Sequence, residues 1–301
     1  MGECVIVNPA AGRGRARRLI ARLGRLRRPS IAVWPTSERG HAVELAERAV
    51  ADGFTTVIAA GGDGTVHEVA NGLLRAGRSD VVLGVWPIGS ANDYAYALGI
   101  DGDWPLRRRT RLSVRPVDVG RVTAAGRVSF FVNGLGIGFN GAVTYESQQI
   151  RGLRGMALYG LAFLKSVVRH FDSPPLTISL DGKERPMRTL AFSINIGKRE
   201  GGFRVTPNAV LDDGLFDYVL AGPLTRWRAL TMLPRLVTGT LPADDPSIRL
   251  GRCREVRVRS ESKLRIHTDG ELFPGSDGEV RELTIELLPA ALLVLRNVDG
   301  S

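Results

Sequence analysis

Apolar segments of two kinds alternate over the first hundred residues, and this alternation constrains the fold more than any other feature. Short buried strands are expected at 3–8, 31–34, 55–60 and 81–87, and helices at 15–26, 40–52, 66–76 and 91–98. In the second of these helices Ala42, Leu45, Ala46 and Ala49 recur at the spacing of one helical face. Strands joined by helices favour a parallel sheet with right-handed crossovers. The sequence therefore predicts an α/β domain in this part of the chain.

The pattern changes after Asp101, where strand-like stretches dominate. Strands are expected at 112–121, 127–135, 176–180, 187–196, 215–220, 255–259, 263–268 and 279–288, and helices only at 154–170 and 225–238. The dipeptide Asp181-Gly182 suits a two-residue hairpin, because both residue types tolerate a positive φ. We predict a mainly antiparallel β-sandwich. The expected domains are 1–121 and 122–290, and the apolar tail 291–301 is able to return to the first domain.

The formal net charge of +10 over 301 residues points to anionic partners. Arginines are concentrated in three blocks, at 13–28, 107–111 and 252–259. Two interpretations stay open, solvated surface arginines and electrostatic docking to an anionic membrane surface. Cys4 and Cys253 are far apart and do not suggest a disulfide framework, which suits a reducing cytoplasm. Because the sequence has no apolar run of about 18 residues, we expect a cytoplasmic protein whose membrane contact is peripheral.

The segment Gly61-Gly62-Asp63-Gly64-Thr65 lies between an expected strand and an expected helix. Glycines let a backbone approach phosphate oxygens closely, and a helix N-terminus attracts anions. A carboxylate inside such a loop is explained if Asp63 holds Mg²⁺, directly or through water. The structural alternative is a tight turn and a well-capped helix, because Thr65 and Glu68 have the spacing of a capping box.

Two further polar loops are expected at the carboxyl ends of neighbouring strands. They are Asn8-Pro9-Ala10-Ala11-Gly12-Arg13-Gly14 and Pro87-Ile88-Gly89-Ser90-Ala91-Asn92-Asp93. In the second loop Ser90 is a candidate N-cap for the next helix. Three such loops at one sheet edge indicate a nucleotide site more strongly than any one of them. The chain lacks both the third glycine of a dinucleotide fingerprint and the Gly-Lys-Ser/Thr of a P-loop.

With these loops the chain resembles the diacylglycerol kinase catalytic-domain family, and particularly its soluble bacterial lipid kinases, which are related to sphingosine kinases. The motifs follow in order along nearly the whole chain: Asn8-Pro9, 61–72, 89–95, 131–136, 205–209, 211–217 and Asp269-Gly270-Glu271. Ser90 departs from the threonine that the family more often has, but both residues offer a hydroxyl. The resemblance implies a Rossmann-like, NAD-kinase-like domain that carries ATP and Mg²⁺, followed by a β-sandwich that contacts the lipid.

The resemblance also implies roles for individual residues. Nucleotide contacts are implied for Asn8, Thr36, Gly61, Gly62, Gly64, Thr65, Ser90 and Asn92. It implies that Mg²⁺ is held through water by Asp63, Asp93 and Asp118, and a separate structural cation by Val210, Asp213 and Leu215. Glu271 matches the position proposed as general base, and Asp63 is the other catalytic candidate. Without the resemblance, Asp269-Gly270 would merely form a hairpin turn and Glu271 would be solvated.

The predicted reaction is transfer of the γ-phosphoryl group of ATP to a lipid hydroxyl, first of all that of diacylglycerol to give phosphatidic acid. A sphingoid or ceramide kinase and an NAD kinase are the alternatives; the Asn92-Asp93 loop and the motif at 212–217 disfavour the NAD kinase. A non-enzymatic basic protein that binds membranes or nucleic acid would leave Asp63 and Asp93 without a purpose. No nucleic-acid partner is therefore expected, and a homodimer is compatible with the sequence.

Two other features have plainer interpretations. The four histidines, His41, His67, His170 and His267, are too scattered for a zinc set and are expected at the surface or as caps. The apolar stretch Met156–Val168 is expected to be core in preference to an acyl-chain pocket.

Overall fold

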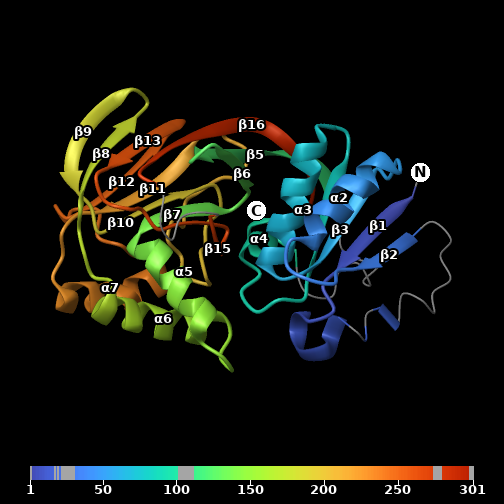
Figure 1. Ribbon diagram of the computed structural model, residues 1–301, viewed down its shortest axis with the longest axis horizontal. Helices are drawn as coiled ribbons and strands as arrows, with labels where there is room; N and C mark the ends of the chain where they lie inside the picture. Colours follow the sequence, from blue (N-terminus) through green and yellow to red (C-terminus); the bar gives the residue numbers. More distant parts are fainter. Residues whose placement is uncertain are drawn as a thin grey trace. The chain divides into compact units, whose positions relative to one another are not determined.

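The computed structural model describes residues 2–16, 18, 20–21, 31–100, 112–273 and 280–297. The chain forms two compact units, Met1–Asp118 with Ala290–Ser301 and Val119–Pro289. Figure 1 shows their elements in sequence colours. Several of the arginines in the first two sequence blocks, Arg22, Arg25, Arg27, Arg28 and those at 107–111, lie outside the described residues.

The described sheet of the first unit contains four parallel strands that the sequence predicts, and the end of β16 (Glu282–Asn297) adds to them. The four predicted strands are β1 (Glu3–Val7), β2 (Ile31–Pro35), β3 (Thr56–Gly61) and β4 (Val82–Pro87), in the order β2-β1-β3-β4. Val57 to Ala60 of β3 are buried whichever face they point to. A parallel strand that is covered on both faces has a continuous apolar sequence, and this explains why β3 does not alternate.

The helical elements of this unit are η1 (Ala11–Gly14), α2 (His41–Ala51), α3 (Asp63–Ala76) and α4 (Asp93–Ala97). The predicted helix at 15–26 is helical at 15–16, 18 and 20–21, and its remainder lies outside the described residues. Helices α2 and α3 approach closely at Gly72, where an added Cβ would overlap the carbonyl of Val43 and the side chain of Ala46.

The predicted capping box is wrong. The N-cap of α3 is Gly62, so Thr65 lies inside the first turn. The carboxylate of Glu68 instead accepts hydrogen bonds from the backbone N–H groups of Gly40 (2.9 Å) and Ala42 (3.2 Å) at the start of α2. Glu68 therefore caps the neighbouring helix, an arrangement that its spacing from Thr65 cannot reveal.

The second unit is a sandwich of two largely antiparallel sheets, which confirms the predicted fold class. One sheet has the order β12-β11-β10-β7-β14-β15, formed by β7 (Gly134–Gly138), β10 (Ala191–Asn195), β11 (Phe216–Ala221), β12 (Ile248–Cys253), β14 (Ile266–Thr268) and β15 (Glu271–Leu272). The other contains β5 (Leu112–Ala124), β6 (Arg127–Phe131), β8 (Pro175–Leu180), β9 (Lys183–Arg188), β13 (Glu255–Ser260) and the first part of β16 (Glu282–Asn297).

The two sheets of the sandwich meet through aromatic and aliphatic side chains. Phe131 of β6 stacks on Phe216 of β11 with ring centroids 5.7 Å apart, and both side chains are fully buried. The hairpin predicted at Asp181-Gly182 joins β8 to β9, and both turn residues have positive φ, 47° and 79°. The Asp181 carboxylate also accepts from the backbone N–H groups of Arg254 and Glu255, so this turn is tied to β13.

The described residues of the second unit form three helices: α5 (Phe139–Gln149), α6 (Gly155–Arg169) and α7 (Arg226–Thr238). They lie on the same side of the sheet that contains β7, β10 and β11 (Figure 1). Phe139 packs edge-to-face against Phe163 at 5.2 Å, which joins α5 to α6. Helix α5 was not expected, because it buries Thr144, Glu146 and Ser147 and its apolar periodicity is correspondingly weak.

Three strand predictions need correction. The segment predicted as one strand at 127–135 is two strands in different sheets, because β6 ends at Phe131 and β7 begins at Gly134. The segment 187–196 likewise divides between β9 and β10, and β12 was missed. The break at 132–133 occurs where backbone N–H groups donate to the Asp269 carboxylate instead of to a ladder.

Strand β16 takes part in both units. Its first part pairs antiparallel with β13, and Leu293 and Val294 pair parallel with β4, so the apolar tail does return to the first sheet. Ala290 interrupts the strand with a φ of 51° and donates its N–H to the Asp118 carboxylate at 2.9 Å.

Candidate functional site

The first part of the candidate site is the turn from β3 into α3. The carbonyl of Gly62 accepts hydrogen bonds from the backbone N–H groups of Thr65 (3.0 Å) and Val66 (3.1 Å), which starts the helix at Asp63. A Cβ at Gly61 would collide with the Thr65 side chain, so only glycine fits there. The turn thus presents a helix N-terminus without side-chain bulk, a geometry suited to phosphate.

A second glycine loop touches the first. The carbonyl of Gly61 accepts from the backbone N–H groups of Ile88 (2.8 Å) and Gly89 (3.0 Å), just beyond β4. A Cβ at Gly89 would overlap the Cα of Gly62. The two loops therefore meet glycine to glycine, and a larger side chain at Gly89 would separate them.

The loop after β1 completes the predicted convergence. Asn8 donates its backbone N–H to the carbonyl of Ala60 (3.0 Å) and its Nδ2 to the Thr65 hydroxyl (3.4 Å). The N–H of Thr36, just after β2, donates to the carbonyl of Val7 at 2.9 Å. Parallel strands end at one edge of their sheet, and the structure confirms that the predicted loops gather there.

The aspartates of this edge begin helices. Asp63 accepts the backbone N–H of Tyr94 through Oδ1 at 3.3 Å, and Asp93 opens α4 with only 4% of its surface exposed. The N-cap of α4 is Asn92, not Ser90; Asn92 has a φ of 52°, and its Nδ2 donates to the carbonyl of Gly89. Ser90 is therefore two residues too early to cap the helix.

Asp118 belongs to the same unit and accepts the N–H of Ala290. Carboxylate oxygens are the donors that Mg²⁺ prefers, so Asp63 and Asp93 fit that ion chemically. Across the described part of the chain, no group of three or more Asp, Glu, His or Cys side chains forms a ready-made chelate.

In the second unit, Asp269 and Gly270 form the tight turn between β14 and β15, as predicted. Their φ values are 51° and 81°, typical of a two-residue hairpin turn, and Glu271 follows directly. The Asp269 carboxylate accepts three backbone N–H groups, from Val132 (3.1 Å), Asn133 (2.8 Å) and Gly134 (3.0 Å). Asp269 therefore holds the turn onto the start of β7 in addition to forming it.

At the predicted structural cation site, the carboxylate of Asp213 is paired with an arginine. Asp213 forms an ion pair with Arg252, and its Oδ1 accepts the backbone N–H of Leu215 at 3.2 Å. Val210 is 40% exposed. A guanidinium pairs with the carboxylate in this structure, and the cation site stays a prediction.

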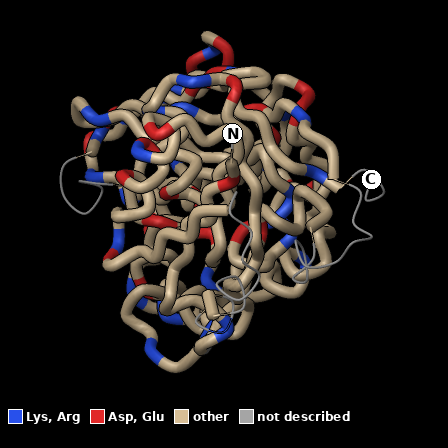
Figure 2. The backbone as a smooth tube through the Cα atoms, turned by 90° about the vertical axis from the view of Figure 1, so that its right-hand side faces the viewer, with Lys and Arg blue, Asp and Glu red and all other residues tan. Residues whose placement is uncertain are grey.

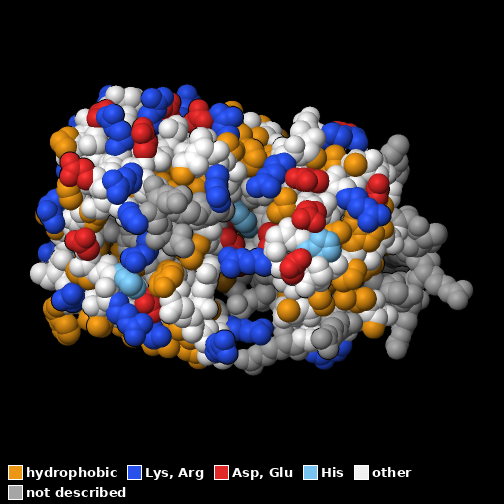
Figure 3. Space-filling model, in the orientation of Figure 1, with side chains coloured by type: hydrophobic (Ala, Val, Ile, Leu, Met, Phe, Trp, Pro, Cys, Tyr) orange, Lys and Arg blue, Asp and Glu red, His pale blue; other side chains and the backbone are white. Residues whose placement is uncertain are grey.

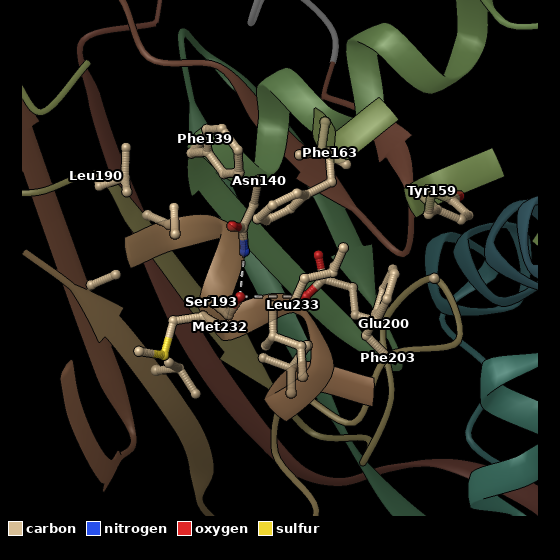
Figure 4. A pocket seen from close by; sticks show the side chains of 18 of the residues that line it. Phe139, Asn140, Tyr159, Phe163, Leu190, Ser193, Glu200, Phe203, Met232 and Leu233 are labelled. Atoms are coloured by element: carbon tan, nitrogen blue, oxygen red, sulfur yellow. Dashed lines mark hydrogen bonds between the residues drawn. The ribbon is translucent and has the colours of Figure 1, made fainter. Parts of the chain in front are cut away.

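A cavity of about 150 Å³ lies inside the second unit, and none of the residues that line it was predicted as a site residue (Figure 4). Its wall is mainly apolar and includes Phe139, Phe163, Leu190, Phe203, Met232 and Leu233. Helix α6 contributes Tyr159 and Phe163 to the cavity, whereas Leu161, Leu164 and Val168 are exposed. The expectation that Met156–Val168 is mainly core is therefore wrong.

Polar side chains occupy one side of this cavity. Asn140 donates to the hydroxyl of Ser193, Ser193 lies 3.4 Å from Glu200 Oε2, and His267 Nε2 lies 2.7 Å from Glu200 Oε1. The same cavity is bordered by Gly270, whose N–H donates to His267 Nδ1 at 3.4 Å. His267 is 1% exposed, so its expected surface position is wrong. Sequence reasoning missed this cluster, since its members come from four separate segments.

Comparison with known proteins accounts for nearly the whole chain. The model of the diacylglycerol kinase catalytic domain matches residues 3–122, and that of the YegS C-terminal NAD kinase beta sandwich-like domain matches residues 134–296. A protein of Bacillus subtilis named "Diacylglycerol kinase" is 29% identical over 90% of this chain and 91% of its own. A Pseudomonas aeruginosa protein named "Probable lipid kinase YegS-like" is 32% identical over 88% of this chain and 84% of its own.

The fold has a solved counterpart as well. A crystal structure titled as a diacylglycerol kinase of Bacillus anthracis superposes with a TM-score of 0.72, at 21% identity, over the full length of this chain and 98% of the other. At that identity the likeness establishes the architecture of the chain.

Proposed function

Because the chain belongs to the diacylglycerol kinase catalytic-domain family, whose members are lipid kinases, we propose that it transfers the γ-phosphoryl group of ATP to a lipid hydroxyl. Diacylglycerol is the first candidate acceptor, with phosphatidic acid as the product. The observation that carries the proposal is the meeting of the loops at Asn8, Gly62 and Gly89 at one sheet edge, with Asp63 among them.

In this proposal the first unit positions the triphosphate. The N-terminus of α3 and the glycine backbone at Gly61 and Gly62 bind phosphate oxygens, while Asn8 and Thr65 orient the loop. Asp63 and Asp93 would hold Mg²⁺, which supplies charge neutralisation on the β and γ phosphates. Phosphoryl transfer needs positioning and electrostatic stabilisation more than covalent help, so a rigid cradle suits it.

Glu271 is the proposed general base. A lipid hydroxyl is a weak nucleophile, and a carboxylate within hydrogen-bond reach can accept its proton during transfer. The Asp269 carboxylate holds the turn onto β7 through three backbone N–H groups, so the segment that carries Glu271 is fixed in place. Gly270 borders the cavity of the second unit, which puts the apolar cavity next to this turn.

The cavity favours a lipid acceptor over NAD. Its apolar wall suits an acyl chain, whereas a dinucleotide would need partners for its phosphates and riboses. Radiolabelled ATP with Mg²⁺ should label diacylglycerol or another lipid in a panel that includes sphingosine, ceramide, phosphatidylglycerol and NAD. Labelled NADP with unlabelled lipids would overturn the proposal, as would a lack of Mg²⁺-dependent ATP binding.

We also propose that helices α6 and α7 dock on an anionic membrane. Leu161, Leu164 and Val168 follow one another at helical spacing on α6, and they are 37%, 45% and 73% exposed. Trp227 of α7 is 76% exposed, and Arg226 beside it donates to the carbonyl of Val167 at 3.0 Å, which joins the two helices. An apolar stripe on the outer side of a helix is typical of an interfacial helix.

The charge of these two helices complements an anionic surface. Neither α6 nor α7 contains an Asp or a Glu, and together they carry Lys165, Arg169, Arg226, Arg228 and Arg235. Lys165 and Arg169 lie beside Glu146 and Arg228 pairs with Asp245, so Arg226 and Arg235 are the main candidates for contact with an anionic surface. Hydrophobic and basic side chains lie side by side along the lower left edge of Figure 3, where α6 and α7 lie in Figure 1. In the part of the chain that the structure describes, no helix is long and apolar enough to cross a bilayer.

The third arginine block is a weaker docking candidate than the sequence suggested. Arg252 pairs with Asp213 and Asp217, Arg257 with Glu255, and Arg259 with Glu184. In Figure 2, Lys and Arg positions are spread along the tube with Asp and Glu positions among them. Paired arginines gain little from a membrane, since they would first lose their own carboxylates.

A further inference from the structure

The side chains of the polar cluster in the cavity are arranged around the Glu200 carboxylate. Asn140 donates to Ser193, and the Ser193 hydroxyl donates to Glu200. His267 lies with its Nε2 2.7 Å from Glu200 Oε1, while its Nδ1 accepts from the N–H of Gly270. The hydrogen bonds from Asn140 to Ser193 and from Ser193 to Glu200 therefore run toward the Glu200 carboxylate (Figure 4), and His267 Nε2 contacts the same carboxylate without the alignment of a hydrogen bond.

Glu200 is placed to contact a ligand in the cavity. Its side chain is 17% exposed and lines the same cavity as Phe139, Phe163 and Phe203. A carboxylate has about four lone-pair directions; Ser193 uses one of them, and His267 Nε2 lies close to the other oxygen. Carboxylates beside apolar walls are costly unless hydrogen bonds compensate, so the remaining capacity favours a ligand with a donor.

Acceptor lipids differ in whether they offer that donor. In diacylglycerol the single hydroxyl is the group to be phosphorylated, and the other oxygens are esters that only accept hydrogen bonds. A monoacylglycerol has a second hydroxyl, a ceramide has an amide N–H and a further hydroxyl, and a sphingoid base has an ammonium group. A site that is built to receive a donor discriminates strongly against a ligand that lacks it.

We infer that Glu200, oriented by His267 and Ser193, determines specificity by binding a second hydrogen-bond donor of the acceptor lipid, beside the chain held in the cavity. This inference rests on the proposed lipid kinase function, and it refines the substrate class. Diacylglycerol places an ester oxygen against the carboxylate, so lipids with a free hydroxyl, amide N–H or ammonium at that position are preferred.

The test compares Glu200 variants on matched lipids. With the full chain, kcat/KM is measured for diacylglycerol, monoacylglycerol, ceramide and sphingosine of equal chain length. Glu200→Ala should lower kcat/KM for the preferred donor-bearing lipids by roughly 10- to 100-fold, the value of one charge-assisted hydrogen bond, and leave diacylglycerol unchanged or improved. Glu200→Gln keeps the size of the side chain and an acceptor oxygen but removes the charge, so kcat/KM should fall most for the ammonium-bearing lipid.

Binding without ATP separates this inference from the kinase proposal. In the wild type, each lipid should displace a fluorescent single-chain amine in the same order of preference as in the kinetic assay. In Glu200→Gln this preference should be weakened, most of all for the ammonium-bearing lipid. Glu261→Gln, at an exposed position of the same unit, is the matched control. Equal losses for all four lipids would show a purely structural role and overturn the inference, as would no change at all. Selective binding without phosphoryl transfer would overturn the kinase proposal instead.

Discussion

Asp63 occupies the first turn of α3, where the helix dipole and the backbone N–H groups favour negative charge. A carboxylate and a phosphate at the same helix N-terminus repel each other, because both are negatively charged, unless a cation lies between them. This conflict is the physical reason for assigning Mg²⁺ to Asp63 and not to an acidic residue elsewhere on the surface. Asp93 repeats the arrangement at the start of α4.

We predict that Asp63→Asn lowers the kinase rate by roughly 10²-fold or more, because the amide keeps the shape but loses the charge that holds Mg²⁺. The free energy of unfolding should change little, since the amide oxygen still accepts the N–H of Tyr94. Steady-state assays over a range of Mg²⁺ concentrations measure the effect. The exposed Asp52→Asn is the control, and an unchanged rate for Asp63→Asn would remove this residue from the mechanism.

Asp269 is predicted to be a structural anchor. Replacing it with alanine leaves the backbone N–H groups of Val132, Asn133 and Gly134 without their acceptor, which should lower the free energy of unfolding by about 3 kcal/mol or more. Asp269→Asn retains one acceptor oxygen, so its free energy of unfolding should fall less than that of Asp269→Ala. Urea denaturation measures both, with the exposed Asp172→Ala as the control. Equal stability of all three variants would contradict the anchor.

At the level of elements, α5 is held to α6 by a buried carboxylate. Glu146 is 1% exposed and interacts with Arg169 and with His170, whose Nε2 lies 2.9 Å from Oε1. Burial by itself raises the pKa of Glu146, but the hydrogen bonds from His170 and Arg169 outweigh it and hold the pKa below its ordinary value of 4.5. The ion cluster therefore compensates for the polar residues that α5 buries.

This lowered pKa gives a pH prediction. A carboxyl whose pKa is lowered on folding stabilises the protein above its unfolded pKa, and the contribution is lost as pH falls through the folded pKa. The wild type should exceed Glu146→Gln in free energy of unfolding at pH 6, and the difference should shrink progressively below pH 4.5. Urea titrations between pH 6 and pH 3 test it. A difference that does not depend on pH would assign the effect to packing.

At the scale of the whole molecule, charge and exposed apolar surface act together. The net charge of +10 raises the local concentration of the protein near an anionic bilayer, and the exposed side chains of α6 and α7 supply apolar contact area. The cavity wall includes residues of these same helices, so docking would bring the membrane to the elements that surround the proposed acyl site.

We predict that binding to vesicles with phosphatidylglycerol weakens as salt rises, because screening shortens the reach of the basic side chains. Trp227→Ala should weaken binding at every salt concentration, by roughly tenfold if its ring is fully buried in lipid. Arg235→Gln should mainly reduce the salt dependence. Co-sedimentation measures each variant against Leu250→Ala, another exposed apolar site, 44% exposed on β12. Vesicle binding that changes neither with salt concentration nor with Trp227→Ala would rule out this surface as the docking site.

Local signals in the sequence were enough for the strands and glycine loops of the first unit and for one turn of the second. Buried runs such as 55–60, the glycines at 61–64 and the turn at Asp269-Gly270 each act over a few residues, so composition and spacing predicted them. The parallel sheet followed from the alternation of strands and helices, and the convergence of the loops followed from the sheet. The family resemblance, which the comparisons confirm, was carried by the same short motifs.

Contacts between distant segments were decided only by the tertiary structure. Glu68 caps α2 across 28 residues, Asp269 breaks a predicted strand 136 residues earlier in the chain, and Glu200 meets His267. Each is a polar group whose partner lies in another element, and the free energy of burying it depends on that partner. No local pattern encodes such a pairing. The meeting of the glycine loops at one sheet edge could therefore be deduced from the sequence, whereas the cavity and its polar cluster required the fold.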